Sequence, residues 1–513
     1  MKPLRMNHTV SQKQRGAAMM VMLIILVLGI AAFLVSALNS SALKSARDQR
    51  TADVLAQAKD ALIGSAAIDS TMPGSLPCPD INDDGSSEGA SGNCTSNIGR
   101  LPWRTLGLPE LRDSSGEHLW YTLSSNFRNV SSSHPLNSET NGLLNVTSGG
   151  QVLNNVIAIV FSPGSALPKI GQDRSSSATT SSCTIGGVPN QPNSRCVQNY
   201  LEGSNAAAPP NLSFQSTATG IEFNDQLITI TREQLFPPVE MRIAREAKKC
   251  LDDYASVNGS IYPWAADPSD TYYSSKANTW FGRLPKRVYI DADVQNLFSA
   301  IGALQTEVTN CANGVGNQAT LQSSGGALET IADFVKNNQP TSPAIATTVT
   351  TPANTAGDRA KDAVVTCANI QSNPTGNSIQ TNLNSAVSAL NAATALPWPA
   401  SCTLVASNYW PDWSNQIFYQ VDTNYAPGAG GFPAVPNISI NSVGAYRAVV
   451  IMARSPILGQ IRVPSDPTKY LEGGNPHTNP APSTVFTSNS LSSPNFKNVN
   501  DLVVCLDGKV NCL

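Results

Sequence analysis

The clearest chemical pattern in the chain is a short acidic segment, residues 80–88, which reads Asp-Ile-Asn-Asp-Asp-Gly-Ser-Ser-Glu. Oxygen-bearing side chains at its positions 1, 3 and 5, followed by glycine at position 6, match the first half of a calcium loop. Serine stands at position 12, so the bidentate glutamate of an EF-hand is missing. The pattern predicts Ca²⁺ ligands at Asp80, Asn82, Asp84 and Glu88, although such clusters also form ordinary turns. No other cofactor is expected.

Signatures of enzymes are absent from the sequence. It contains no Gly-x-Ser-x-Gly, no His-Glu-x-x-His and no Gly-x-Gly-x-x-Gly pattern, and it has only four histidines. His118 is predicted to be a residue at a strand edge rather than a catalytic base. We therefore expect no catalytic residues and no enzymatic activity, while a membrane-tethered enzyme that uses a carboxylate pair stays open as an alternative.

The ten cysteines form an even set, which is typical of a disulfide framework built in an oxidising compartment. No Cys-x-x-Cys occurs, so zinc ligation is disfavoured. Three pairs close short loops, a fourth would tie together an inserted helical region, and the fifth remains. The predicted pairs are Cys78 with Cys94, Cys183 with Cys196, Cys250 with Cys402, Cys311 with Cys367, and Cys505 with Cys512.

Aromatic side chains are few, 6% of the residues, yet they gather in two segments rich in polar residues. A rigid apolar ring with a polar edge suits contacts with sugars or with protein surfaces. The predicted surface or polysaccharide patch consists of Trp264, Tyr272, Tyr273, Trp410 and Trp413. Most of the aromatic residues in the two segments are nevertheless expected to belong to the hydrophobic core, and the patch is the remainder.

Charge is scarce and unevenly distributed in this chain of 513 residues. Only 13% of the residues are charged, and the net charge is −3, which excludes a basic nucleic-acid-binding protein. Residues 1–16 nevertheless carry four basic residues and no acid, and they precede the uncharged stretch 17–38. At about 1.5 Å per residue, this stretch is long enough to cross the roughly 30 Å hydrocarbon core. A signal peptide is the alternative, but its apolar core is shorter.

The basic leader sets the expected orientation. Positive residues stay in the cytoplasm, so a single-pass inner-membrane protein with a cytoplasmic N-terminus and a periplasmic bulk is predicted. Apolar residues at helical spacing continue beyond the apolar stretch, so the helix is expected to extend to about residue 70.

The junction Lys13-Gln14-Arg15-Gly16, followed at once by an apolar helix, resembles the class III signal of type IV pilins and type II secretion pseudopilins. The resemblance covers about residues 1–60. It implies cleavage after Gly16 by a prepilin peptidase, N-methylation of Ala17, and packing of the helix against other pilin-like subunits in an extracellular filament. Most pilins have glutamate at the fifth mature position, where this chain has Val21. This departure implies a minor or tip-type subunit.

Beyond that helix, the sequence repeats itself weakly and in order. Residues 58–62 are echoed at 247–251, Gly-Arg-Leu-Pro at 99–102 recurs at 282–285, and Tyr-Leu-Glu-Gly at 200–203 recurs at 470–473. The second copy is longer by about 115 residues, and apolar residues at helical spacing predict a helical insertion there, at 287–395.

The predicted fold class is α+β, with a long N-terminal membrane or filament helix packed on an antiparallel β-sheet, followed by a second, duplicated α+β unit. The expected domains are a leader at 1–16, a transmembrane helix at 17–38, a pilin-like domain at 71–236 and its repeat at 237–513. The predicted function is a minor pilin-like or pseudopilin-like subunit of a type IV pilus or type II secretion filament, at the tip or protruding, with a surface-binding outer region. A permanently membrane-anchored adhesin or binding protein is the alternative.

Overall fold

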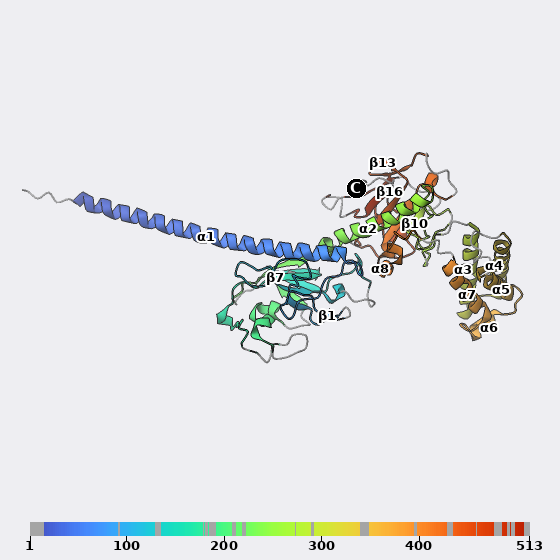
Figure 1. Ribbon diagram of the computed structural model, residues 1–513, viewed down its shortest axis with the longest axis horizontal. Helices are drawn as coiled ribbons and strands as arrows, with labels where there is room; N and C mark the ends of the chain where they lie inside the picture. Colours follow the sequence, from blue (N-terminus) through green and yellow to red (C-terminus); the bar gives the residue numbers. More distant parts are fainter. Residues whose placement is uncertain are drawn as a thin grey trace, which may run out of the picture. The chain divides into compact units, whose positions relative to one another are not determined.

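A computed structural model gives the architecture of the chain (Figure 1). Contacts divide it into two compact units. Unit 1 comprises residues 1–62, 77–125 and 143–230, and unit 2 comprises residues 63–76, 126–142 and 231–513. The structure describes residues 15–90, 93–128, 135–177, 179, 183, 191–207, 212–217, 222–271, 273–276, 278–288, 292–338, 348–393, 398–427, 434–457, 459–476, 485–489, 493 and 498–506.

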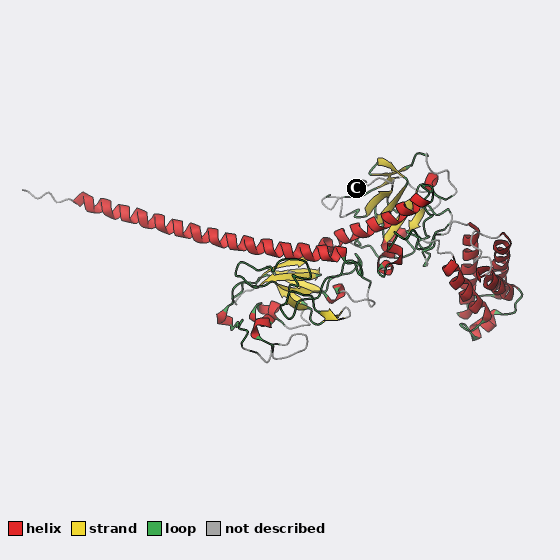
Figure 2. Cartoon of the chain, in the orientation of Figure 1, coloured by secondary structure: helices red, strands yellow, loops and turns green. Residues whose placement is uncertain are grey.

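Unit 1 is built from one long helix and a four-stranded antiparallel sheet (Figure 2). The helix α1 spans Arg15–Ile68, and its buried residues Leu55, Ala58 and Leu62 recur at helical spacing. Lys59 donates a hydrogen bond from Nζ to the carbonyl of Thr229 in the last strand, at 3.0 Å. The sheet order is β3 (Ile98–Arg100), β4 (Trp120–Leu123), β7 (Ala158–Ser162) and β9 (Gln226–Ile230).

Unit 2 has the same arrangement. Helix α2 (Arg232–Val257) begins at a capping box formed by Thr231 and Gln234, and it packs on a four-stranded antiparallel sheet. Lys248 donates from Nζ to the carbonyl of Cys505 at 3.1 Å, the counterpart of the contact made by Lys59. The sheet order is β10 (Phe281–Arg283), β11 (Ile417–Val421), β14 (Ala448–Met452) and β16 (Leu502–Leu506).

Each unit adds a three-stranded mixed sheet in which two strands pair in parallel, a feature that was not predicted from the sequence. In unit 1 the order is β6 (Gln151–Val156), β5 (Leu144–Ser148) and β8 (Ser213–Gln215). In unit 2 it is β13 (Val443–Tyr446), β12 (Ile438–Ile440) and β15 (Val485–Phe486). A small hairpin, β1 (Gly89–Ala90) with β2 (Asn93–Cys94), completes unit 1.

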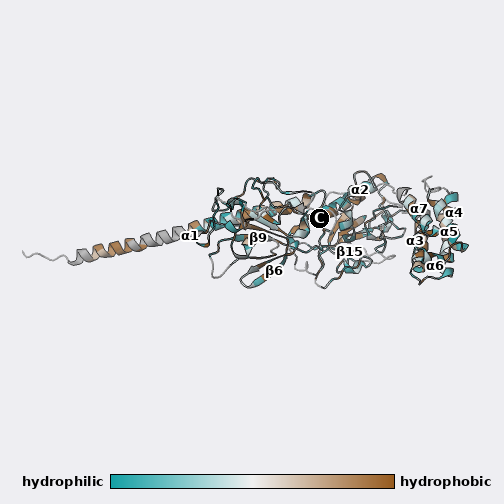
Figure 3. Cartoon of the chain, turned by 90° about the horizontal axis from the view of Figure 1, so that it is seen from below, coloured by the Kyte–Doolittle hydropathy of each residue, from teal (hydrophilic) through white to brown (hydrophobic). Residues whose placement is uncertain are grey.

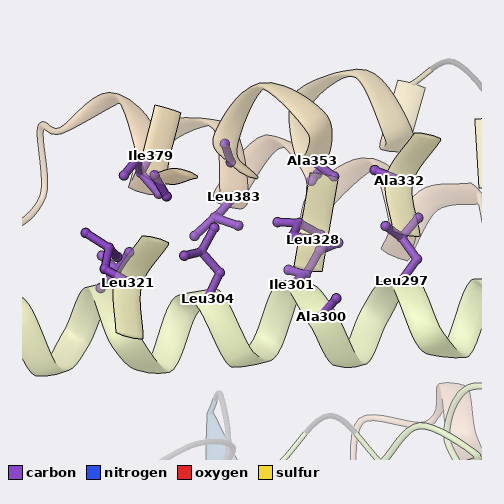
Figure 4. Packing of buried hydrophobic residues seen from close by; sticks show 14 of the residues in the cluster. Leu297, Ala300, Ile301, Leu304, Leu321, Leu328, Ala332, Ala353, Ile379 and Leu383 are labelled. Carbon is purple, nitrogen blue, oxygen red and sulfur yellow. The ribbon is translucent and has the colours of Figure 1, made fainter. Parts of the chain in front are cut away.

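Residues 287–395, predicted as a helical insertion, contain a bundle with its own core (Figure 4). Gly325 and Gly357 let two helices touch, since a Cβ on Gly325 would lie 2.7 Å from the carbonyl oxygen of Gly357. The core contains Leu297, Leu304, Leu328 and Leu383. The helices are α3 (Ala292–Ala312), α4 (Gln318–Asn338), α5 (Thr350–Lys361), α6 (Cys367–Ser372) and α7 (Ser378–Ala393).

The prediction of a membrane-spanning helix is wrong for the part of the chain that the structure describes. There, no helix is both long enough and apolar enough to cross a bilayer. The α+β class is observed, but the predicted membrane helix, and with it the single-pass inner-membrane location, is corrected.

Candidate functional site

The acidic segment 80–88 folds as a tight loop that is tied to unit 1 at both ends. A disulfide between Cys78 and Cys94 brackets it. The main chain of Asp80 pairs with that of Arg100 through two hydrogen bonds, of 3.0 and 2.6 Å. Gly85 has a φ of +84°, and a Cβ there would lie 2.4 Å from the indole of Trp103, so glycine is required for both reasons.

Within this loop, side-chain oxygens hold the turn by accepting hydrogen bonds from backbone N–H groups. Asp80 accepts from the amides of residues 82, 83 and 85 at 3.0, 2.7 and 2.7 Å. Asn82 accepts from the amide of Asp84 at 2.9 Å, and Glu88 accepts from that of Ile81 at 2.8 Å. These bonds hold the side-chain oxygens of the loop in place.

Three of the four predicted ligands come together here. Carboxylate oxygens of Asp80, Asp84 and Glu88 all lie within 4.8 Å of one another. Burial and then the charge of Asp83 raise the pKa of Asp80, and burial followed by the charges of Asp80 and Asp84 raises that of Glu88. A divalent cation would relieve this repulsion, and hard oxygen ligands suit Ca²⁺. Asn82 lies on the same loop, with its side chain exposed.

His118 braces this loop, a role that the sequence did not suggest. Its Nδ1 lies 2.7 Å from Asp83 Oδ1, and its Nε2 contacts Glu110. Burial alone would raise the pKa of Asp83, but the hydrogen bond to His118 and the charge of Arg100 outweigh burial and lower it. His118 therefore positions the segment from outside.

A second polar cluster lies deep in each unit, and it explains the repeated Tyr-Leu-Glu-Gly sequence. In unit 1, Asp225 Oδ2 accepts from the amide of Glu202 and from Asn205 Nδ2, both at 2.9 Å. Gln172 donates to Glu202 Oε1 at 2.7 Å. Burial and then the charge of Glu202 raise the pKa of Asp225 to about 9.

The counterpart in unit 2 has the same atoms in the same roles. Asp501 Oδ2 accepts from the amide of Glu472 and from Asn475 Nδ2, both at 2.9 Å, and Gln460 donates to Glu472 at 3.0 Å. Burial and then the charge of Glu472 raise the pKa of Asp501 well above its ordinary value. Because the carboxyls of both pairs are buried and bonded to backbone, their arrangement fits a structural role.

A tyrosine ring sandwiched by two guanidinium groups adjoins each carboxyl pair. In unit 1, Tyr200 has Arg100 at 4.1 Å and Arg174 at 4.5 Å from its centroid. In unit 2, Tyr470 has Arg283 at 4.3 Å and Arg462 at 4.6 Å. The arginine of the Gly-Arg-Leu-Pro repeat is therefore the first cation of each sandwich.

Two of the five residues of the predicted aromatic patch are buried. Trp410 and Trp413 are 2% and 0% exposed, so they belong to the core of unit 2, and their assignment to an exposed patch is corrected. Their apolar rings pack against other rings, with Trp413 6.2 Å from Phe236. Trp264 and Tyr273 are partly exposed, and Tyr272 lies outside the described residues.

Four of the five predicted disulfides are confirmed. They join Cys78 to Cys94, Cys183 to Cys196, Cys250 to Cys402, and Cys311 to Cys367. The fifth predicted pair involves Cys512, which lies outside the described residues. Disulfides in this number are typical of proteins that fold in an oxidising compartment.

The first half of α1 carries the largest exposed apolar surface among the described residues. Every side chain from Met19 to Leu28 is between 51% and 76% exposed, and all are apolar (Figure 3). Gly16 and Ala17, the predicted processing site, lie within α1, but the exposure of these two residues is outside what the structure describes.

Comparison with known proteins does not identify the chain. No protein-family model, no curated protein and no solved structure matches it.

Proposed function

We propose that the chain is a minor, pilin-like structural subunit that joins a type IV pilus or type II secretion-like filament through the first half of α1. Its outer region, which follows α1 in the chain, would bind a surface. A prepilin peptidase that cleaves after Gly16, followed by methylation of Ala17, would prepare the helix for packing with other pilin-like subunits.

The observation that carries this proposal is the apolar surface of α1. Ten consecutive exposed apolar side chains, residues 19–28, encircle the helix rather than form a stripe. A helix that is apolar all round is stable when other apolar elements surround it, and exposed apolar surface of this extent marks an interaction site. A bundle of similar helices at the centre of a filament would supply that environment.

The rest of α1 supports the same proposal. Leu55, Ala58 and Leu62 are buried, so this part of the helix is an integral part of unit 1. The two parts of one continuous helix thus have different partners. One holds the folded unit, and the other is left for association.

Calcium binding at the loop 80–88 is a separate proposal. The close approach of the carboxylates of Asp80, Asp84 and Glu88, within 4.8 Å of one another, supports it, and the bound ion would stiffen the loop.

The filament proposal is tested with the full chain, expressed in cells that contain prepilin peptidase and other pilin-like subunits. We expect the mature protein to begin at methylated Ala17 and to co-purify with those subunits. Ile25→Asp should abolish co-purification, because a charge would be buried among apolar helices. Gln57→Asp is the matched control, since Gln57 is an exposed residue of the same helix. An intact Met1 terminus, or equal capture by the two variants, would contradict the proposal.

A further inference from the structure

Unit 2 contains a pocket with a volume of about 280 Å³, beside the short helix α8 (Trp410–Trp413). Three parts of the chain line it. They are a loop with Thr271 and Tyr273, a segment after β10 with Lys286 and Arg287, and the α8 region with Trp410 and Ser414. The volume is at the lower end for ligand sites, so the pocket suits one ring-sized group.

Tyr273 organises this pocket. Its φ is +53°, a conformation that a bulky side chain rarely adopts. Its ring meets that of Trp410 edge-on, at 5.8 Å between centroids, and its hydroxyl accepts from Ser414 Oγ at 3.0 Å and donates to Asn415 Oδ1 at 2.8 Å. An unfavourable backbone conformation persists only where the surrounding structure fixes it. Such conformations are common at functional sites.

The backbone of Tyr273 also places the two cations. Its carbonyl accepts hydrogen bonds from the amides of Lys286, at 2.7 Å, and Arg287, at 3.2 Å. The carbonyl of Lys286 in turn accepts from Trp398 Nε1 at 3.1 Å. The chain segment that carries both cations is therefore held in place at the rim.

The electrostatic character of the pocket is positive. No carboxylate lines it, and Lys286 is exposed and stands in no ion pair that the structure shows among the described residues. A neighbouring pocket in unit 2 differs in this respect, because Asp267 and Asp270 line it together with Lys276. Of these two pockets, the one at Tyr273 has the lining suited to an anion, since it contains Lys286 and Arg287 and no carboxylate.

We propose that this pocket binds a carboxylate-bearing sugar ring, the uronic-acid unit of an acidic polysaccharide. The cations at 286 and 287 would face the carboxylate, the half-buried ring of Tyr273 would contact an apolar face of the sugar, and the hydroxyls of Thr271 and Ser414 are within the lining to meet sugar hydroxyls. The inference rests on the surface-binding part of the proposed function and specifies its ligand.

The test uses the full chain and isothermal titration calorimetry with three probes, which are trigalacturonate, a neutral galactose trimer and a pentaglutamate peptide. We expect trigalacturonate to bind and the other two to bind at least tenfold more weakly. Lys286→Glu should weaken trigalacturonate binding at least tenfold. Lys469→Glu, the same change at an exposed lysine elsewhere in unit 2, should leave it unchanged.

Three results would overturn the inference. These are no binding of trigalacturonate by the unmodified chain, equal binding of the neutral trimer, and binding of pentaglutamate as tight as that of trigalacturonate. An equal loss in both lysine variants would also overturn it, since binding would then reflect overall charge. Thermal melting checks that Lys286→Glu is folded, and Lys286→Gln serves in its place if it is not.

The outcome is separable from that of the filament proposal. Lys286→Glu leaves α1 intact, so it should still co-purify with pilin-like subunits even where sugar binding is lost. Ile25→Asp should retain sugar binding while it loses those subunits.

Discussion

Two equivalent loops, one in each unit, share a backbone scaffold and differ in chemistry. In unit 1 the main chain of Asp80 pairs with Arg100, and in unit 2 the main chain of Ala266 pairs with Arg283 through bonds of 3.0 and 2.8 Å. Around the first pair the loop gathers carboxylates, whereas after the second it leads to Tyr273 and two cations. The fold thus preserves the anchor of the loop and leaves its outer residues free to acquire separate binding roles.

The anchor itself shows why certain residues recur. Glycine precedes each arginine because a Cβ at Gly99 would lie 2.5 Å from the carbonyl oxygen of Asp80, and one at Gly282 would lie 2.0 Å from that of Ala266. The two arginines differ in one respect. Arg100 has Asp83 at 3.9 Å, whereas Arg283, 0% exposed, has no carboxylate partner among the described residues.

This difference predicts unequal effects when the sandwiched tyrosine is removed. Tyr470→Leu should lower the free energy of unfolding by about 3–5 kcal/mol, because Arg283 would lose a ring that offsets its burial. Tyr200→Leu should cost less, since Arg100 keeps Asp83. Urea denaturation followed by circular dichroism measures both. A larger cost for Tyr200→Leu would contradict the comparison.

The glycine anchors give the next largest effect. Gly282→Ala should destabilise unit 2 by about 1–3 kcal/mol, because the new methyl group meets backbone that cannot move aside. Gly99→Ala should destabilise unit 1 somewhat less, because its Cβ would lie 2.5 Å from the nearest backbone oxygen rather than 2.0 Å. Gly302→Ala in α3 is the control, because nothing lies within 4 Å of its Cβ position. Thermal melting measures all three variants. If Gly302→Ala lowers the melting temperature as much as the other two changes do, close contact with the backbone is not the cause.

Calcium should act on only one of the two loops. At ten times its Kd the ion is expected to stabilise unit 1 by about 1.4 kcal/mol, seen as a rise in melting temperature that a chelator reverses. Asp84→Asn with Glu88→Gln keeps hydrogen-bond acceptors but removes charge, so it should abolish the response. Asp267→Asn with Asp270→Asn in unit 2 should leave the response to calcium unchanged. A response that survives the first double change would exclude this site.

The buried carboxyl pairs of the two units should make stability depend on pH in the same way, and this is the smallest of the expected effects. Asp225 has a raised pKa in the folded chain, so the folded state binds more protons than the unfolded state between about pH 4 and 9, and stability falls as pH rises through that window. Asp225→Asn mimics the protonated form and should reduce this fall, by about 2–4 °C in melting temperature between pH 6 and 9. Asp501→Asn should do the same.

Asp173→Asn is the matched control, because Asp173 is exposed and hydrogen bonds from Ser175 and Asn193 lower its pKa. Asp173→Asn should leave the pH dependence of the melting temperature unchanged between pH 6 and 9. If Asp173→Asn reduces that dependence as much as Asp225→Asn does, the buried carboxyl pair does not cause it.

Local patterns in the sequence predicted much of this architecture. Apolar residues at helical spacing indicated α1 and the inserted helices, and the ordered repeats indicated a second α+β half. Four disulfides followed from spacing and position along the chain. For the helices and for the two disulfides that close short loops, the signal lies in neighbouring residues, whereas Cys250–Cys402 followed by elimination.

Other features depended on contacts between distant residues, and the sequence did not reveal them. His118 was interpreted as a strand-edge residue, but it lies against Asp83, 35 positions away. Trp410 and Trp413 were assigned to a surface, because polar neighbours in sequence gave no indication that rings from other elements would bury them. The parallel pairing of β5 with β8 joins strands far apart in the chain and has no local signal.

The amino-acid order alone determined that the chain forms two similar α+β halves with an acidic loop in the first and paired cysteines throughout, because these are matters of local spacing. Only the tertiary structure decided what each polar residue does. It placed Glu202 and Asp225 beside each other inside unit 1, and it brought Tyr273, Lys286 and Trp410 to one pocket. Burial and charge act through space, so the partners that set them cannot be assigned until the chain has folded.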